Sequence, residues 1–267
     1  MQAITNFSKL VNRQTIIVIV LSLLATYACL RFNYIIDLPT GIIGIAVVFP
    51  IVFSINAAYR RREEALRYFA SLKAHAAALY YAHRDWVPAH THEHADRMAH
   101  ITTRLLQALH QYFSSCGENE QHFQTIYQLF DELSHSMEQL RGTGIPANEI
   151  SRANQYLRSM IIDFERMRNI YLYRTPTALR TYSQIFLNVF PVLFAPYFAF
   201  LSTENSVSSG FLVAALYGLI LVSLENIQED LENPFDGVGA DDLNLNVADH
   251  YRSVLTSSDP YSVSSNQ

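Results

Sequence analysis

Three large apolar side chains recur at every fourth position of an uncharged segment, residues 40–59. They are Ile45, Phe49 and Phe53. Since successive helical residues are about 100° apart, these three lie on nearly one face of a helix, over roughly 12 Å of its axis. Such a face either packs against another helix or forms the wall of a narrow, water-repelling pore. The spacing alone leaves both alternatives open.

A run of acidic residues near the C-terminal end could bind a hard cation through carboxylate oxygens, as calcium sites do. The run comprises Glu225, Glu229, Asp230, Glu232, Asp236, Asp241 and Asp242. After Phe235 the acids are separated by small residues, and the spacing of an EF-hand loop is absent. We therefore interpret the run as a solvated acidic helix end. Asp236, Asp241 and Asp242 stay a candidate calcium site, and the sequence implies no other cofactor.

Alternating histidines at His90, His92 and His94 form the third group with potential chemistry. Imidazoles at this spacing could ligate zinc or nickel. The group has no cysteine partner and no HExxH motif, and it follows Pro88 at a predicted helix start. It is therefore interpreted as a surface helix entry that titrates near neutral pH, and no metal site is predicted there.

The elements that carry these groups follow from composition. Half of the 267 residues are hydrophobic and only 16% are charged, which is low for a soluble domain. The deficit is confined to four segments, which are residues 15–30, 40–59, 182–201 and 210–224. The first three are long enough to cross a bilayer, while the fourth needs a thin bilayer or burial in an assembly. A signal peptide is a poor interpretation of the first, because no good cleavage site follows it.

Basic residues predict the orientation of these spans. Lys9 and Arg13 precede the first span, Arg60, Arg61 and Arg62 follow the second, and Arg174 and Arg180 precede the third. The connecting segments 32–39 and 202–209 contain neither residue type. The sequence thus predicts a multi-pass protein of the cell membrane with both termini in the cytoplasm. Its net charge of −5 gives no polybasic case for nucleic acid.

The middle of the chain is predicted to be helical and cytoplasmic. The second span continues without a break to about residue 81, and amphipathic helices are expected over 98–114 and 122–140. Asn148 is a candidate N-cap for a further helix that reaches residue 172. No strand or nucleotide-binding glycine pattern is found, which predicts an all-α membrane protein. Five segments are expected. Residues 1–58 hold the N-terminal part and the first two spans, 59–174 form the helical cytoplasmic domain, and 175–224 hold the last two spans. Residues 225–255 are an acidic cytoplasmic segment, and 256–267 are a disordered tail.

Two stretches of this chain resemble the bestrophin family of ion channels, including its bacterial members. The second span matches the family in one gapless register at Pro39, Gly44-Ile45-Ala46, Phe53, Asn56, Tyr59, Arg61 and Glu64-Ala65. After the fourth span, Glu232-Asn233-Pro234-Phe235 and Asp242-Leu243 match with one extra residue between them. Thr175-Pro176 is a weaker match, with Tyr182 one place late. The chain departs from the family at Ser54, where an arginine is usual, and at Arg60 and Glu63.

The resemblance implies a homopentamer around a central pore. By the gapless match, the neck of that pore is lined by Ile45, Phe49 and Phe53 of each subunit. The second constriction of the family, a cytoplasmic aperture, would fall near Thr177. The resemblance therefore implies that the protein is a membrane-embedded ion channel and not an enzyme.

The sign of the ion depends on how the aromatic rings of the neck are turned. A benzene ring has a positive edge and a negative face, so inward edges favour weakly hydrated anions and inward faces favour cations. Because two of three neck layers are aromatic, we expect small monovalent anions such as chloride. A cation channel of the same fold and a non-conducting membrane scaffold are the alternatives. A di-iron membrane enzyme would need several paired histidine boxes, and this chain offers one cluster.

Overall fold

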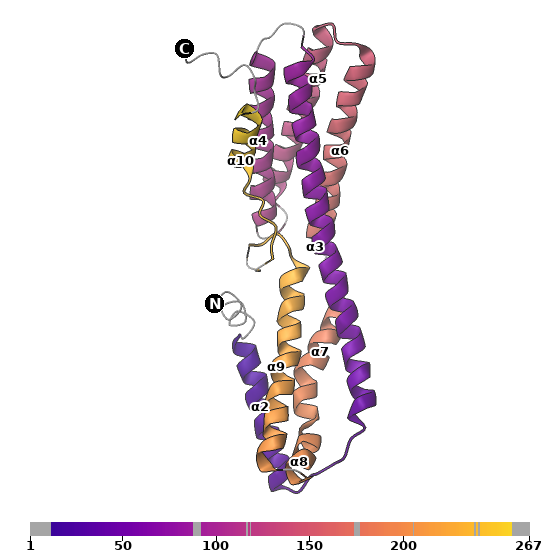
Figure 1. Cartoon of the computed structure of the whole chain (residues 1–267), viewed down its shortest axis with the longest axis vertical. Coiled ribbons are helices and arrows are strands. Elements are labelled where there is room, and N and C mark those ends of the chain that lie inside the picture. Colours follow the sequence, from indigo (N-terminus) through magenta and orange to yellow (C-terminus); the bar gives the residue numbers. More distant parts are fainter. Residues whose placement is uncertain are drawn as a thin grey trace. The chain divides into compact units, whose positions relative to one another are not determined.

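The computed structural model describes residues 12–87, 92–115, 117, 119–173, 177–204, 206–237, 239 and 241–257. Every regular element in these ranges is a helix, so the predicted all-α class is confirmed for this part of the chain (Figure 1). The contacts divide the chain into two compact units. Unit 1 is Met1–Arg61 with Arg174–Asn233, and unit 2 is Arg62–Tyr173 with Pro234–Gln267.

Unit 1 is built around helix α9, Val207–Glu232. It packs against α2 (Arg13–Arg31), α7 (Thr177–Leu193) and α8 (Ala195–Glu204). The first part of α3 (Thr40–Asp85) belongs to the same unit and reaches its core through Ile51, which packs with Leu187 and Leu221. A second small cluster joins α8 and α9 through Phe198 and Ala214.

Three helical stretches in the described part of the chain are long and apolar enough to cross a membrane. They are Arg13–Arg31, Gln184–Glu204 and Val207–Glu232. These correspond to the first, third and fourth predicted spans. The fourth is no longer short, because α9 continues through the acidic residues to Glu232. The second predicted span lies in α3, where the side chains of residues 40, 42, 43, 46 and 47 are outside the described ones, and it stays a prediction.

Pro191 explains why the third span is two helices. Proline has no N–H for the preceding turn, and α7 ends two residues later at Leu193. The hydroxyl of buried Ser22 on α2 donates to the Pro191 carbonyl at 2.7 Å, which ties α2 to this break. Gly210 of α9 allows α8 to approach closely. A Cβ at this position would lie 2.0 Å from the Phe198 carbonyl oxygen and 2.0 Å from Ser202 Oγ.

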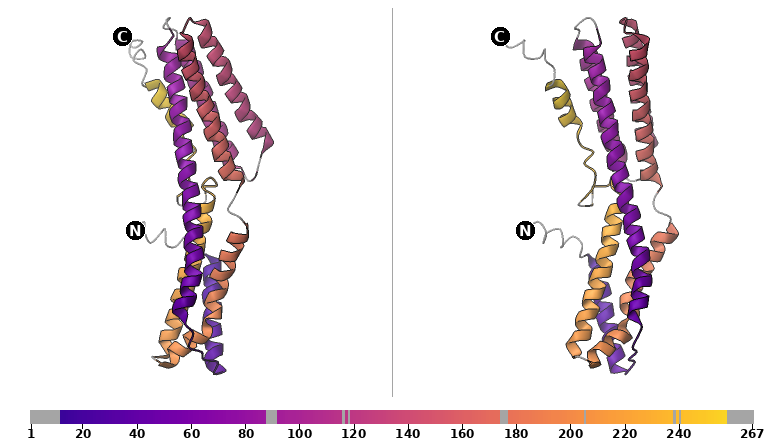
Figure 2. Two further views of the ribbon diagram at one scale, coloured as in Figure 1. Left: turned by 90° about the vertical axis from the view of Figure 1, so that its right-hand side faces the viewer. Right: turned by 45° about the vertical axis from the view of Figure 1, so that its right-hand side comes forward.

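Unit 2 contains the rest of α3 together with α4 (His92–Ser114), α5 (Glu120–Gly142), α6 (Ala147–Leu172) and α10 (Ala248–Ser257). Helix α5 packs between α4 and α6, and α10 packs on α4. Figure 2 shows α4, α5 and α6 running side by side with this part of α3. The core of unit 2 is large and apolar. Among its fully buried side chains are Leu72, Leu105, Ile126, Leu133 and Phe164.

The helix bounds correct two expectations. Helix α6 starts at Ala147 with Pro146 at the N-cap position, so the prediction of Asn148 as N-cap is wrong. Ile145 and Ile150 flank this start and belong to the same buried cluster, so an apolar staple fixes the helix entry instead. The short helix α10 lies inside a segment that had no predicted helix. It ends at Ser257, and residues 258–267 of the expected disordered tail lie outside the described residues.

Candidate functional site

The predicted neck residues lie on the open face of α3. Ile45, Phe49 and Phe53 are 59%, 58% and 63% exposed in the protomer. On the opposite face Ile51, Ser54 and Ala58 are each 1% exposed. The Phe49 and Phe53 rings are neighbours, with centroids 6.1 Å apart and planes at 34°. The helix thus buries one face in unit 1 and leaves the predicted neck face free for a partner or a pore.

Ser54 replaces the arginine expected from the resemblance, and its position shows what the change does. The residue is buried, and its hydroxyl has no hydrogen-bond partner among the described residues. A guanidinium at this buried position would lose its water, which is costly unless an acidic group pairs with it. A small side chain suits the packing of α3 against the core of unit 1.

Thr177, the predicted aperture residue, is the first residue of α7. Its side chain is outside the described ones, so the aperture stays a prediction.

The loop after α9 is anchored in unit 2 by Phe235. This side chain is 2% exposed and stacks on Phe113 of α4, with ring centroids 4.6 Å apart. Tyr171 of α6 meets the same ring edge-on at 6.1 Å. The Leu243 N–H donates to the Pro234 carbonyl at 2.9 Å and closes the loop. The Pro-Phe pair of the sequence pattern is therefore a packing anchor.

Two of the three candidate calcium residues lie together in this loop. Burial, the hydrogen bond to Asp236 and the like charge of Asp236 together raise the pKa of Asp242 to about 6, while the N–H of Gly239, 3.2 Å from Asp242 Oδ2, acts in the opposite direction. Two carboxyl groups joined by a hydrogen bond share a proton more readily than they both ionise. Asp241 is exposed, and its backbone carbonyl accepts from Arg62 Nε at 2.8 Å. In the described part of the chain, no group of three potential ligands is placed to hold a metal ion.

The acidic run is not uniformly solvated, which corrects its interpretation as a solvated helix end. Glu225 and Glu232 are 3% and 4% exposed, whereas Glu229 and Asp230 point to solvent. Burial of the first two follows from their place on the face of α9 that turns toward the other helices of unit 1. The acidic composition gave no signal of this division.

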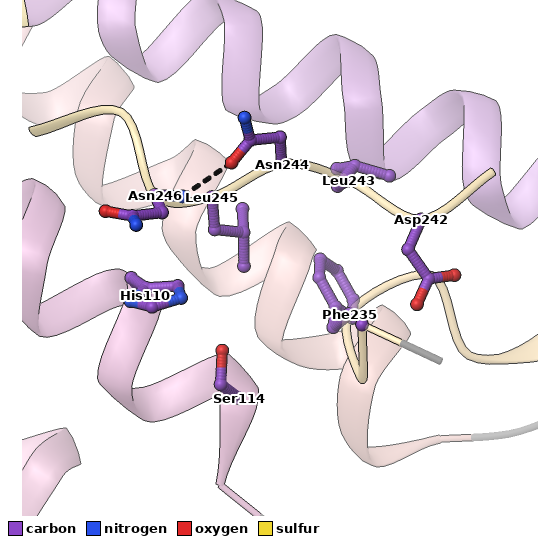
Figure 3. Close-up of a pocket in the computed structure, with 9 residues that line it drawn as sticks. His110, Ser114, Phe235, Asp242, Leu243, Asn244, Leu245 and Asn246 are labelled. Atoms are coloured by element: carbon purple, nitrogen blue, oxygen red, sulfur yellow. Dashed lines mark hydrogen bonds between the residues drawn. The ribbon is translucent and has the colours of Figure 1, made fainter. Parts of the chain in front are cut away.

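A cavity of about 250 Å³ lies between α4 and the loop that follows Phe235 (Figure 3). His110 and Ser114 project toward it from α4, and Asp242, Asn244 and Asn246 line it from the loop. The N–H of Asn246 donates to Asn244 Oδ1 at 3.1 Å, which fixes the turn of the backbone. Sequence reasoning missed this cavity, because its residues come from two distant segments with no shared motif.

The histidine cluster at the start of α4 is only partly described. His90 lies outside the described residues, as does the side chain of His92, while His94 is half-buried. A different histidine, His83 of α3, is 2% exposed and has its Nδ1 2.9 Å from the Leu79 carbonyl oxygen. Burial lowers the pKa of His83, the hydrogen bond to the Leu79 carbonyl raises it in part, and the nearby charge of His94 lowers it.

No known protein-family profile matches the sequence, and no curated protein matches it. Solved structures do match. A bacterial bestrophin homologue from Klebsiella pneumoniae aligns with a TM-score of 0.75 and 18% identity, over 91% of this chain and 96% of that chain. A single-substitution variant of that homologue aligns with a TM-score of 0.79 and 17% identity, over 91% and 96%. A structure described only as a membrane protein aligns with a TM-score of 0.77 and 18% identity, over 91% and 96%.

These likenesses extend over nearly the whole of each chain, at identities too low to show more than a shared fold. Together with the three apolar helices, the membrane-protein neighbours indicate a membrane protein. The fold expected from the motifs of the second span and of the Pro-Phe loop is confirmed. The chain has the fold of the bacterial bestrophin homologues.

Proposed function

We propose that this protein is a pentameric ion channel of the bestrophin type that passes small monovalent ions, with chloride favoured. Ile45, Phe49 and Phe53 form its neck, and Thr177 lies at its cytoplasmic aperture. The observation that carries the proposal is the division of α3 into a buried face and an open apolar face, with all three proposed neck residues on the open one. In the proposed topology both termini are cytoplasmic.

A ring of such faces around an axis accounts for the chemistry. An apolar constriction conducts only while it stays wet, so the neck can close by losing its water. Phenylalanine edges turned toward the axis stabilise an anion that gives up part of its hydration. Phenylalanine faces turned toward the axis would do the same for a cation, which makes ring orientation the determinant of ion sign.

The decisive measurement is the reversal potential of the purified protein in a planar bilayer under a tenfold KCl gradient. A shift to the chloride equilibrium potential is the expected result. A shift to the potassium potential would keep the pore and reverse its selectivity. Absence of current, with the protein shown to be inserted, would contradict conduction and favour the scaffold.

Variants then assign the current to the neck. Phe49→Ala combined with Phe53→Ala widens the constriction and should change the unitary conductance several-fold. The matched control is Phe32→Ala, which removes the same group from an 81% exposed position outside α3. Equal conductance in both variants would contradict the assignment of the neck.

A further inference from the structure

A carboxylate is buried in unit 1, on one of the helices that is apolar enough to cross a membrane. Glu225 of α9 is 3% exposed and belongs to the candidate span Val207–Glu232. Ionisable side chains inside such segments are expensive and are retained where they perform a task. The proposed neck and aperture do not use Glu225, so its task is a separate question.

The carboxylate is held by amides from two other helices. Asn188 Nδ2 of α7 lies 3.2 Å from Glu225 Oε1 and 3.0 Å from Oε2. Gln14 Nε2 of α2 donates to Glu225 Oε2 at 3.2 Å and to Asn188 Oδ1 at 3.0 Å. The three side chains form a closed triad, Gln14–Asn188–Glu225, in which every pair is joined by a hydrogen bond.

The triad joins α7 to helices on two sides. Asn226 follows Glu225 in α9, and its Oδ1 accepts from Asn12 Nδ2 at 3.0 Å. This second amide contact ties the start of α2 to α9. Asn188 Nδ2 also lies 2.8 Å from the Gln184 carbonyl of its own helix, which fixes the direction of the amide. Hydrogen bonds in a low-dielectric interior are electrostatically stronger than the same bonds in water. Glu225 therefore contributes to the position of α7 relative to both α2 and α9.

We propose that Glu225 is a positioning residue that sets the place of α7 through the Gln14–Asn188–Glu225 triad, and through α7 the gating of the channel. This inference rests on the proposed function, because α7 begins at the proposed aperture residue. Glu225 does not contact the permeating ion. Its loss changes how often the pore is open and leaves the conductance of the open pore unaltered.

An exchange of donor and acceptor tests the triad without changing the size of any side chain. Glu225→Gln replaces one of the two acceptor oxygens that face Asn188 Nδ2 by an amide donor, and Asn188→Asp places a second carboxyl group against the first. Each single variant should lower the midpoint of thermal unfolding in detergent by about 5 °C. Each should also change the open probability several-fold, with unitary conductance and reversal potential unchanged. The double variant restores one carboxylate and one amide, so both readouts should return toward wild type.

The chain offers a matched control pair, an amide and a carboxyl group, four residues away on each of the two helices. Gln184 Nε2 donates to Glu229 Oε1 at 3.0 Å between the same two helices, but this pair is exposed. The exchange Gln184→Glu with Glu229→Gln, singly and together, should leave both readouts near wild type.

Amide hydrogen exchange of α7 gives a readout that does not depend on current. It should rise in both single triad variants and fall again in the double variant. If the effects of the two substitutions on the unfolding midpoint and on amide exchange simply add in the double variant, the triad is overturned. If amide exchange of α7 changes while the open probability does not, the role of the triad in gating is overturned. If wild type itself carries no current, the proposed function and the gating role fall together, while the exchange cycle still decides whether Glu225 positions α7.

Discussion

The two units of this protein are built from the same kind of helix and have opposite surfaces. Unit 2 buries its large apolar side chains, and its exterior is polar and linked by surface ion pairs such as Arg104–Glu132. Unit 1 exposes apolar side chains, with Ile16, Leu24, Leu212 and Ile220 each between 57% and 62% exposed. Its buried positions include Ser22, Thr26, Ser54, Glu225 and Asn226. In unit 1 buried polar residues join the helices beside two small apolar clusters, whereas the core of unit 2 is one large apolar cluster.

This difference is the one expected between helices that associate in lipid and helices that associate in water. In water, helices associate because association removes apolar surface from the solvent. In lipid that advantage is absent, and helices associate through close packing of small residues and through hydrogen bonds. Ser22, Gly210 and the Gln14–Asn188–Glu225 triad are the devices of this second kind.

The largest effect that separates the units is expected from Phe164→Ala in unit 2. Phe164 is fully buried and meets the rings of Tyr112, Phe113 and Phe130 at 5.9–6.2 Å. Its removal leaves a cavity and should lower the free energy of unfolding by about 4 kcal/mol. The exposed Phe32→Ala in unit 1 should change it by less than about 0.5 kcal/mol. Denaturant unfolding in detergent measures both, and similar losses would contradict the contrast drawn between the units.

The next effect concerns the close contact of helices in unit 1. Gly210→Ala would place a Cβ against the Phe198 backbone, and backbone cannot move aside without shifting α8 or α9. We expect a loss of about 2 kcal/mol in the free energy of unfolding, measured by the same denaturant series. Gly142 of unit 2 has nothing within 4 Å of the equivalent Cβ. Gly142→Ala should therefore be neutral or slightly stabilising, and a loss there as large as at Gly210 would refute the steric explanation.

The same contrast explains how far the sequence could predict the structure. In unit 2 the apolar residues of α4 and α5 recur with the helical period, because one face is buried and the other is wet, and those helices were predicted within a few residues at most ends. In unit 1 the helices are apolar on all sides, so periodicity does not tell a packed face from a lipid-facing or pore-facing one. The burial of Glu225 could not be predicted, since the same residue type is exposed four residues later at Glu229. Helix α10 was missed because its buried residues, Ala248 and Leu255, are few and its remaining residues are polar.

His83 is a buried polar group of unit 2, and it gives that unit a dependence on pH. Its pKa is lowered in the folded protein, chiefly by burial. The unfolded chain therefore binds a proton more readily, and stability is lost as the pH falls below the ordinary histidine pKa of about 6.5. His83→Gln should flatten this part of the stability curve, while the exposed His135→Gln should leave it as it is. Unfolding midpoints measured between pH 5 and 7.5 give the dependence of stability on pH. If that dependence is the same in His83→Gln as in wild type, it comes from other titrating groups.

Asp242 gives the smallest expected effect, with the opposite sign. Its pKa is raised to about 6, from an ordinary value of 3.8, by burial and by Asp236. The folded state therefore binds the proton more tightly, and the stability gained from it is complete below pH 3.8 and lost as the pH rises through 6. Asp242→Asn removes the repulsion and should stabilise the protein at pH 7 by about 1 kcal/mol or less, because the side chain is only half-buried and solvent screens it.

Calcium reverses this expectation if the loop binds it. A cation between Asp236 and Asp242 would offset their repulsion, so added calcium would raise the unfolding midpoint of wild type and leave Asp242→Asn unchanged. Equal midpoints of wild type with and without 1 mM calcium, a concentration at the weak end of known calcium sites, would exclude such a site. The carboxyl pair would then act only as a shared-proton contact that closes the loop beside Phe235. The two outcomes differ in whether calcium shifts the unfolding midpoint of wild type, which a single thermal series at pH 7 measures.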